Sequence, residues 1–161
     1  MIMTALNEKN EKIDLPDQLA SLLVKVDQDV LLLPNVTVAE IVNVSKVEKV
    51  DGKPDWYIGN INWRDLEIPL ISYEGMKDQG IPGLKSSARI IILNGIKGNG
   101  LLPFYGFVSQ SIPRLSRVSP REIDQEEERS EHIDSISLNL NGESVTIPDL
   151  ENIEQMLLDA L

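Results

Sequence analysis

The segment 58–71 limits the possible folds more than any other stretch, because it reads as two short strands joined by a tight turn. Apolar and polar residues alternate on both sides of Arg64-Asp65, and a period of two is typical of half-buried strands. Ile61 and Trp63 are expected on one face, with the even-numbered residues on the other. The segment therefore predicts a β-hairpin with an exposed cation at its tip.

The composition favours a β-rich protein. The chain has 161 residues, of which 42% are hydrophobic but only 4% are aromatic. Its core must therefore be built mainly from Ile, Leu and Val, and the β-branched residues among these pack well on pleated sheets. A chain of this length can bury a sizeable core as one compact unit or as two small subdomains.

The charge and the absence of cysteine exclude several classes of function. The formal net charge is -11, which disfavours binding to nucleic acid or to an anionic membrane surface. The chain has no cysteine, so disulfides, thiolate metal sites and a Cys nucleophile are excluded. It also has no run of about 18 apolar residues. We therefore expect no nucleic-acid partner, no direct membrane insertion and a cytoplasmic location.

Residues suited to catalysis or to metal binding are scarce. The one histidine, His132, follows the acidic run 126–131, and no Gly-x-Ser-x-Gly motif is present to supply a nucleophile. Glu128 and Glu131 could join His132 at a metal, but zinc sites need three or four converging ligands. The glycine-rich stretch 95–100 lacks the Gly-Lys-Ser/Thr ending of a phosphate loop, so a turn is expected there. The sequence predicts no enzyme, no metal site and no cofactor.

Several further strands are expected from apolar runs and turn signals. In the segment 89–93, the four residues after Arg89 are all apolar, so the segment is predicted to be buried on both faces and to lie at the centre of the second half of the chain. Asn141-Gly142 favours a type I′ turn, and Gly106 marks a candidate bulge. The strands expected besides the central hairpin are 21–26, 29–33, 42–47, 89–93, 101–110, 135–140 and 143–147.

The remaining segments are predicted to be loops or short helices. Residues 1–17 are polar and read as a flexible arm. Asn35 is expected to cap a short helical turn, and Asp149 a C-terminal helix over 149–161. The stretch 73–87 is interpreted as a loop because it is rich in Gly and Pro. The acidic stretch 123–133 is read as a solvated loop, with docking of a basic partner as the alternative.

The central hairpin resembles the CheW-like domain, the adaptor module that joins chemoreceptors to a histidine kinase. The similarity lies in Gly59-x-x-Asn62-x-Arg64, preceded by Pro54-Asp55-Trp56 and followed by Ile68-Pro69-Leu70-Ile71. The usual family pattern is G-x-x-N-L-R-G, then P-[VI]-[VI]-D-L. This chain departs from that pattern at Trp63, at Asp65 and at Ser72-Tyr73.

A finer resemblance concerns the accessory CheW-like proteins of the type IV pilus (twitching) chemosensory system. It is carried by the stretch 31–40, by Pro54-Asp55-Trp56 and by Trp63-Arg64. The resemblance to the family as a whole covers roughly 22–161, with stronger motifs before Ser72 than after it.

The resemblance implies a mainly-β, CheW-like fold of two intertwined, SH3-like, five-stranded β-barrel subdomains, with short helices and a C-terminal helix. The implied domain spans 18–161. Its subdomains are expected at roughly 36–88 and 89–147, plus exchanged strands, with the helix at 149–161.

The resemblance also implies a function and a site. The expected function is non-enzymatic coupling of methyl-accepting chemoreceptors to a CheA-type histidine kinase, at membrane-associated receptor arrays. In the family, an acid at the position of Glu40 pairs with the arginine at the position of Arg64, and a groove near Val38 receives the receptor tip. Trp56 and Trp63 could be core residues or partner anchors. The residues expected to bind partners are Val36, Val38, Glu40, Trp56, Asn62, Trp63 and Arg64.

Three alternatives stay open. The chain could serve another chemosensory array. It could be a free-standing barrel that binds a small ligand, which predicts a deep apolar pocket. A hydrolase is disfavoured by the single histidine and by the missing nucleophile.

Overall fold

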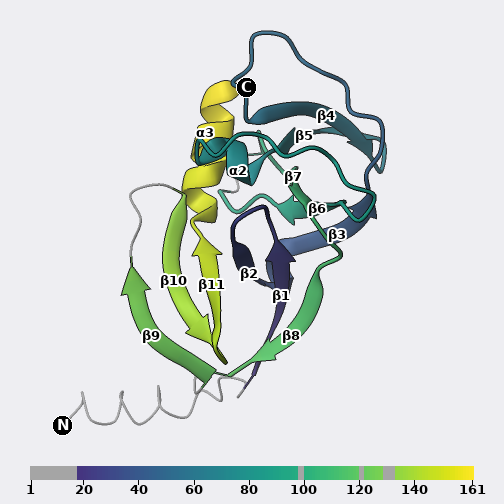
Figure 1. Ribbon diagram of the computed structural model, residues 1–161. Helices are drawn as coiled ribbons and strands as arrows, with labels where there is room; N and C mark the ends of the chain where they lie inside the picture. The colour runs from purple at the N-terminus through teal and green to yellow at the C-terminus, as the bar shows by residue number, and fades with distance from the viewer. Residues whose placement is uncertain (1–17, 98–99, 120–121, 129–132) are drawn as a thin grey trace, which may run out of the picture.

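The computed structural model describes residues 18–97, 100–119, 122–128 and 133–161. Figure 1 shows two β-sheets, with a C-terminal helix that rises from one sheet and runs alongside the other. In chain order the elements are β1 (Leu19–Lys25), β2 (Val30–Pro34), η1 (Asn35–Thr37), β3 (Val38–Asn43), β4 (Tyr57–Trp63), β5 (Leu66–Ile71), α2 (Tyr73–Met76), β6 (Arg89–Asn94), β7 (Phe104–Ser109), β8 (Arg114–Val118), β9 (Ile123–Glu128), β10 (Asp134–Leu140), β11 (Glu143–Pro148) and α3 (Leu150–Ala160).

The two sheets confirm the mainly-β class. One sheet has five strands in the order β3-β6-β7-β5-β4, and the other has six in the order β8-β1-β2-β11-β10-β9. The sixth strand, β9, comes from the acidic stretch that was expected to be a loop. That prediction was wrong, because β9 pairs with β10 at the edge of the six-stranded sheet.

The two halves of the chain are intertwined. The strands β1 and β2 precede the five-stranded sheet in sequence, yet they belong to the six-stranded sheet, where β2 pairs in parallel with β11. The segment 89–93 was expected at the centre of the second half, and that prediction was wrong. It forms β6, which pairs with β3 and β7 in the five-stranded sheet. The chain changes sheet between β7 and β8.

The five-stranded sheet closes on itself after β3. The backbones of Glu48 and Asn60 exchange two hydrogen bonds, with N–O distances of 2.9 and 2.8 Å. Gly59 permits this approach, because a Cβ at that position would lie only 2.4 Å from the Glu48 carbonyl oxygen. The bridge joins the chain that follows β3 to β4, so the sheet forms a small barrel.

The buried residues form three cores, and β6 separates two of them. Ile90 and Ile92 are buried in the core of the five-stranded sheet, together with Ile61. Ile91 and Leu93 are buried in a second core, which the two sheets share with α3. This alternation confirms that the apolar run of β6 is buried on both faces.

The turn and cap chemistry was largely predictable. The hairpin of β10 and β11 turns at Asn141 (φ 52°) and Gly142 (φ 85°), as a type I′ turn requires. The hairpin of β1 and β2 also forms as expected. The Asp149 side chain accepts a hydrogen bond from the Asn152 N–H at 3.1 Å and caps α3. Ile153 of this helix is buried in the core between the sheets.

Several local expectations were wrong. Asn35 makes no side-chain cap, because the short helix η1 begins directly after Pro34. The strand expected at 42–47 is β3, which begins at Val38 because it pairs along β6. Gly106 is not a bulge, since its pairing with β6 is regular. The glycine there reflects close packing instead, as a Cβ would lie 3.0 Å from Ile90 Cγ2.

The loop expected at 73–87 contains the short helix α2. Ser72 caps this helix by accepting a hydrogen bond from the Gly75 N–H at 3.0 Å. The expected flexible arm, 1–17, and His132 lie outside the described residues.

Candidate interaction site at the hairpin tip

The turn between β4 and β5 holds two non-glycine residues in the left-handed region. Arg64 has φ 50° and Asp65 has φ 61°. This backbone costs free energy for residues that carry a Cβ, although Asp tolerates it better than most. The turn leaves the Arg64 side chain 68% exposed, which confirms the expected cation at the tip of the hairpin.

The guanidinium of Arg64 packs on the ring of Trp63. The Trp63 side chain is buried, and its ring packs edge to face against Phe104, with the two centroids 4.8 Å apart. The Arg64 Cζ lies 4.7 Å from the Trp63 ring centroid, within the range of a cation–π contact. Trp63 is therefore both a core residue and a platform for the guanidinium.

Glu40, on β3, completes the arrangement. Its Oε2 accepts a hydrogen bond from Trp63 Nε1 at 2.6 Å and lies 3.6 Å from Arg64 Nη2. We refer to Glu40, Trp63 and Arg64 as the hairpin-tip cluster. An exposed ion pair contributes only about 0–1 kcal/mol to stability, so this contact orients the guanidinium more than it stabilises the fold.

The structure places the other expected partner-binding residues around or away from this cluster. Asn62 is exposed on β4, opposite Glu67. Val36 is 80% exposed on η1, while Val38 is half-buried against the core between the sheets. Trp56 is also half-buried against that core, rather than against the core that holds Trp63. The structure thus brings Glu40, Trp63 and Arg64 together but does not bring Trp56 to them.

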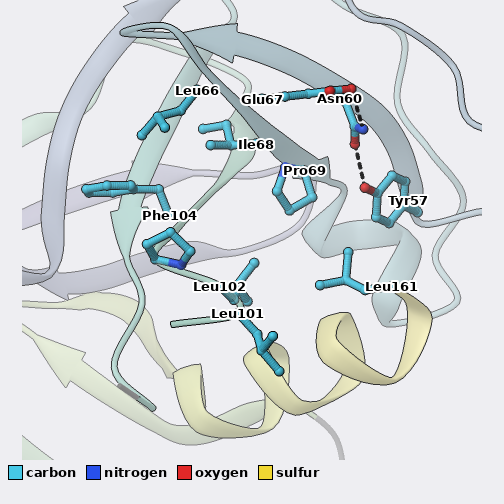
Figure 2. Close-up of a pocket in the computed structure, with 11 residues that line it drawn as sticks. Tyr57, Asn60, Leu66, Glu67, Ile68, Pro69, Leu101, Leu102, Phe104 and Leu161 are labelled. Carbon is cyan, nitrogen blue, oxygen red and sulfur yellow. Dashed lines mark hydrogen bonds between the residues drawn. The ribbon is translucent and has the colours of Figure 1, made fainter. Parts of the chain in front are cut away.

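Beside the cluster lies a hollow of about 230 Å³ that sequence reasoning missed. Figure 2 shows it between β5, the chain before β7 and the C-terminal end of α3, with Leu66, Leu101 and Leu161 around it. These three side chains are 43%, 72% and 55% exposed. Pockets for small ligands are commonly about 300–1,000 Å³. This hollow is smaller than that, so it is not the deep apolar pocket that the ligand-binding alternative predicts.

Polar groups line one wall of the same hollow. The Tyr57 hydroxyl donates to Asn60 Oδ1, and Asn60 Nδ2 donates to Glu67 Oε1 at 2.9 Å (Figure 2). Burial raises the pKa of the Tyr57 phenol, and the negative charge of Glu67 raises it further. The Tyr57 hydroxyl therefore remains protonated at neutral pH and holds the Asn60 amide in one orientation.

The sequence held only weak signals for these lining residues. Phe104 begins a strand expected from its apolar run, but nothing local indicates that its ring meets Trp63. Leu101 follows a glycine-rich turn and reads as an ordinary loop residue.

Within the ranges that the structure describes, no three side chains of His, Asp or Glu are placed to hold a metal ion. In the same ranges, no helix has the length and apolar character needed to cross a membrane.

Comparison with known proteins identifies the fold. A model of the CheW-like domain matches residues 20–157 of this chain. Among solved structures, the chain is similar to the scaffolding protein TtCheW from Thermoanaerobacter tengcongensis, with a TM-score of 0.69 and 17% sequence identity. The similarity covers 84% of this chain and 87% of that chain. A comparison with curated proteins gave no match. The expected CheW-like fold is confirmed.

Proposed function

This chain belongs to the CheW-like domain family, and we propose that it is a non-enzymatic coupling protein that links methyl-accepting chemoreceptors to a CheA-type histidine kinase. The observation that carries the proposal is the extent of the family match, from residue 20 to residue 157. The match includes both sheets and most of α3, so the whole adaptor architecture is present. The proposed location is the cytoplasm, at membrane-associated receptor arrays.

The hairpin-tip cluster supports a binding role for this architecture. Arg64 is an exposed cation on a chain whose formal net charge is -11. Trp63 and Glu40 hold the guanidinium in place before any partner arrives, which lowers the entropy lost on binding. A planar guanidinium suits a carboxylate on the partner, because the two can form paired hydrogen bonds.

By analogy with the family, the receptor's helical tip would lie in the groove near Val38, while one barrel would dock the regulatory domain of the kinase. Val36, two residues before Val38, is 80% exposed, which supports this assignment because the side chain is accessible to a partner. The signal would pass as a small reorientation that biases a two-state kinase, and this chain would perform no chemistry.

Within the family, we assign the chain to the type IV pilus (twitching) system, as an accessory adaptor of the ChpC type. The support is the set of motifs around Glu40, Trp56 and Trp63-Arg64. Trp63 is one of the positions at which this chain departs from the usual family pattern, and its indole N–H donates a hydrogen bond to Glu40. A leucine, which is usual in the family at this position, could not form that bond. An adaptor of another array is the alternative, and the receptors captured in the experiment below would distinguish the two.

The charge reversal Arg64→Glu tests the proposal. The variant should keep the circular dichroism spectrum and melting temperature of the wild type, because an exposed charge at a turn contributes little to stability. It should lose most of its binding to kinase or receptor in a pull-down from the host cell, through the reversed charge at the docking surface. In a pilus system, twitching should change although pili are still made.

Lys25→Glu is the matched control. Lys25 is exposed on β1, in the other sheet, and its reversal changes the net charge by the same amount. The control should bind kinase and receptor as the wild type does. Wild-type binding of both partners by Arg64→Glu would remove Arg64 from the site.

A further inference from the structure

Three asparagines of this chain, Asn94, Asn99 and Asn141, are each followed by a glycine. Asparagine is one of the thermolabile residues, because its side-chain amide can be lost as ammonia. A following glycine favours this loss, since it has no Cβ to hinder the approach of its backbone nitrogen to the asparagine side chain. Asn99 lies outside the described residues. For the other two asparagines, the surroundings decide which one can react.

Asn94, at the end of β6, is held together with the glycine that follows it. Its Nδ2 donates a hydrogen bond to the Val36 carbonyl oxygen at 3.3 Å. The Gly95 N–H donates to the Pro103 carbonyl oxygen at 2.8 Å. Gly95 is also tightly packed, since a Cβ there would overlap the Leu102 carbonyl oxygen. Both groups that would react are therefore fixed, and the backbone has no room to rearrange.

Asn141, at the tip of the hairpin of β10 and β11, has different surroundings. Both Asn141 and Gly142 are exposed. A Cβ at Gly142 would have no atom within 4 Å, so there is open space beside the turn. Unlike Asn94, the Asn141 side chain makes no hydrogen bond to any other described residue. Asn141 therefore has the freedom to react that Asn94 lacks.

One hydrogen bond holds the reacting nitrogen at this tip. The Gly142 N–H donates to Asn139 Oδ1 at 2.8 Å. Ring closure requires a rotation in the backbone of Asn141 that brings the Gly142 nitrogen onto Asn141 Cγ, and this rotation breaks the hydrogen bond. The reaction therefore needs a local opening of the turn, and exposed loop tips open at a small cost in free energy. Asn139 is the side chain that opposes this opening.

We propose that Asn141 deamidates spontaneously in the folded protein and that Asn139 sets the rate. Water or hydroxide removes the proton of the Gly142 N–H, and the nitrogen forms a bond to Asn141 Cγ. The Cγ–Nδ2 bond breaks, and the side-chain nitrogen leaves as ammonia with a proton returned from solvent. Water then opens the cyclic imide at either carbonyl carbon, which leaves aspartate or isoaspartate. The inference is independent of the proposed coupling function.

The modification changes a turn on which distant parts of the fold depend. Either product adds a negative charge close to Glu143, which contacts Arg114 at 3.1 Å. Isoaspartate also adds a methylene carbon to the backbone of the turn, and the turn sets the register of β10 and β11. The strand β11 pairs in parallel with β2 and leads into α3. Older copies of the protein should therefore be both more acidic and less stable than new ones.

Two full-length variants test the proposal beside the wild type. Asn139→Ala removes the acceptor, whereas Asn139→Asp keeps an oxygen in its place. After incubation, peptide mass spectrometry should show replacement of the amide NH₂ by OH at Asn141 but not at Asn94, and faster at alkaline pH. Asn139→Ala should react about fivefold faster than the wild type, the factor expected for the loss of one hydrogen bond. Asn139→Asp should react no faster than the wild type.

The same incubation in urea separates the effect of the fold from that of the sequence. In the unfolded chain Asn94 and Asn141 should react alike, and Asn139→Ala should lose its advantage. A rate for folded Asn139→Ala that stays below its rate in urea, with an unchanged circular dichroism spectrum, shows that this variant still folds. An unmodified Asn141 in the folded wild type, or equal rates in the wild type and Asn139→Ala, would overturn the proposal.

Discussion

The two hairpins of β4–β5 and β10–β11 share one turn geometry but build it from different residues. Both turns place two consecutive residues at positive φ, Arg64 and Asp65 in the first and Asn141 and Gly142 in the second. Asn-Gly is among the best sequences for this conformation, whereas Arg-Asp is not. The difference is a free-energy cost that only the first hairpin carries.

The two turns are also stabilised by different contacts. The second turn is supported locally, since Asn139 Oδ1 accepts a hydrogen bond from the Gly142 N–H at 2.8 Å. The first is supported by Trp63 below it and by Glu40 from a distant strand. Unfavourable backbone conformations persist where the surrounding structure holds them, and they often mark functional sites. The comparison therefore shows that the side chains of the first turn make contacts with distant residues, whereas the residues of the second turn suit the backbone conformation that the turn requires.

The largest effect is expected at the second turn. Gly142→Val should lower the free energy of unfolding by about 1–3 kcal/mol, because a β-branched residue resists positive φ. Space is not the cause, since a Cβ at Gly142 would have no atom within 4 Å. Urea denaturation measures the change. Gly83→Val is the control, because Gly83 also faces open space but has no positive φ. Equal stability of Gly142→Val and the wild type would mean that this turn does not need its glycine.

A smaller loss is expected when the support of the first turn is removed. Trp63→Phe keeps an aromatic ring against Phe104 but deletes the N–H that binds Glu40, and it should cost about 1 kcal/mol of stability. Thermal denaturation measures it. Trp56→Phe is the matched control, because no hydrogen bond from the Trp56 indole occurs among the described contacts. The same cost in both variants would show that the bond to Glu40 contributes nothing specific.

Relief of the unfavourable backbone at the first turn should raise stability slightly. Asp65→Gly places the residue usual in the family at φ 61° and should stabilise the protein by up to about 1 kcal/mol. Partner binding should be retained, because Arg64 is unchanged. Asp55→Gly, at a position without positive φ, should not stabilise. A loss of stability in Asp65→Gly would contradict the view that this turn is strained.

The smallest effect concerns the pair across the first turn. In binding to kinase or receptor, Glu40→Ala and Arg64→Ala should be non-additive, with a coupling of at least about 0.5 kcal/mol. Their coupling in stability should stay within about 0–1 kcal/mol, because the pair is exposed. A double-mutant cycle in titration calorimetry and in urea denaturation separates the two quantities. Strict additivity in binding would mean that Glu40 does not act through Arg64.

The parts of the fold that could be predicted are those fixed by neighbours in sequence. The hairpin of β4 and β5 follows from alternation, and the hairpin of β10 and β11 also from its Asn-Gly turn. The cap at Asp149 follows from capping chemistry, and all three signals act over a few residues. The sheet to which β6 belongs could not be read in this way, because it depends on pairing with β3 and β7. The strand β9 was missed because a run of acidic residues is typical of a solvated loop, and no local pattern predicts its pairing with β10.

The site was predictable to a similar degree. Alternation alone placed Arg64 and Trp63 on opposite faces and predicted an exposed Arg64, which is found. It left open whether Trp63 is a core residue or a partner anchor, and the structure buries it. The meeting of Glu40 with Arg64 came from family resemblance, since no local pattern links β3 to the tip of this hairpin. The contact of Trp63 with Phe104 could not be anticipated, because it depends on the closure of the five-stranded sheet.

The placement of β1 and β2 has a consequence for how the chain folds during synthesis. Every strand of the five-stranded sheet lies between Val38 and Ser109, so that sheet can form before the chain beyond Ser109 has been synthesised. The strands β1 and β2 can complete their pairing in the six-stranded sheet only after β11 has been synthesised, because Leu31 of β2 pairs opposite Thr146 of β11. Contacts between residues so far apart in sequence form slowly, and the apolar residues of β1 and β2 stay available to wrong partners meanwhile. We therefore expect the N-terminal hairpin to be the last part of this protein to reach its final position and the part most dependent on chaperones.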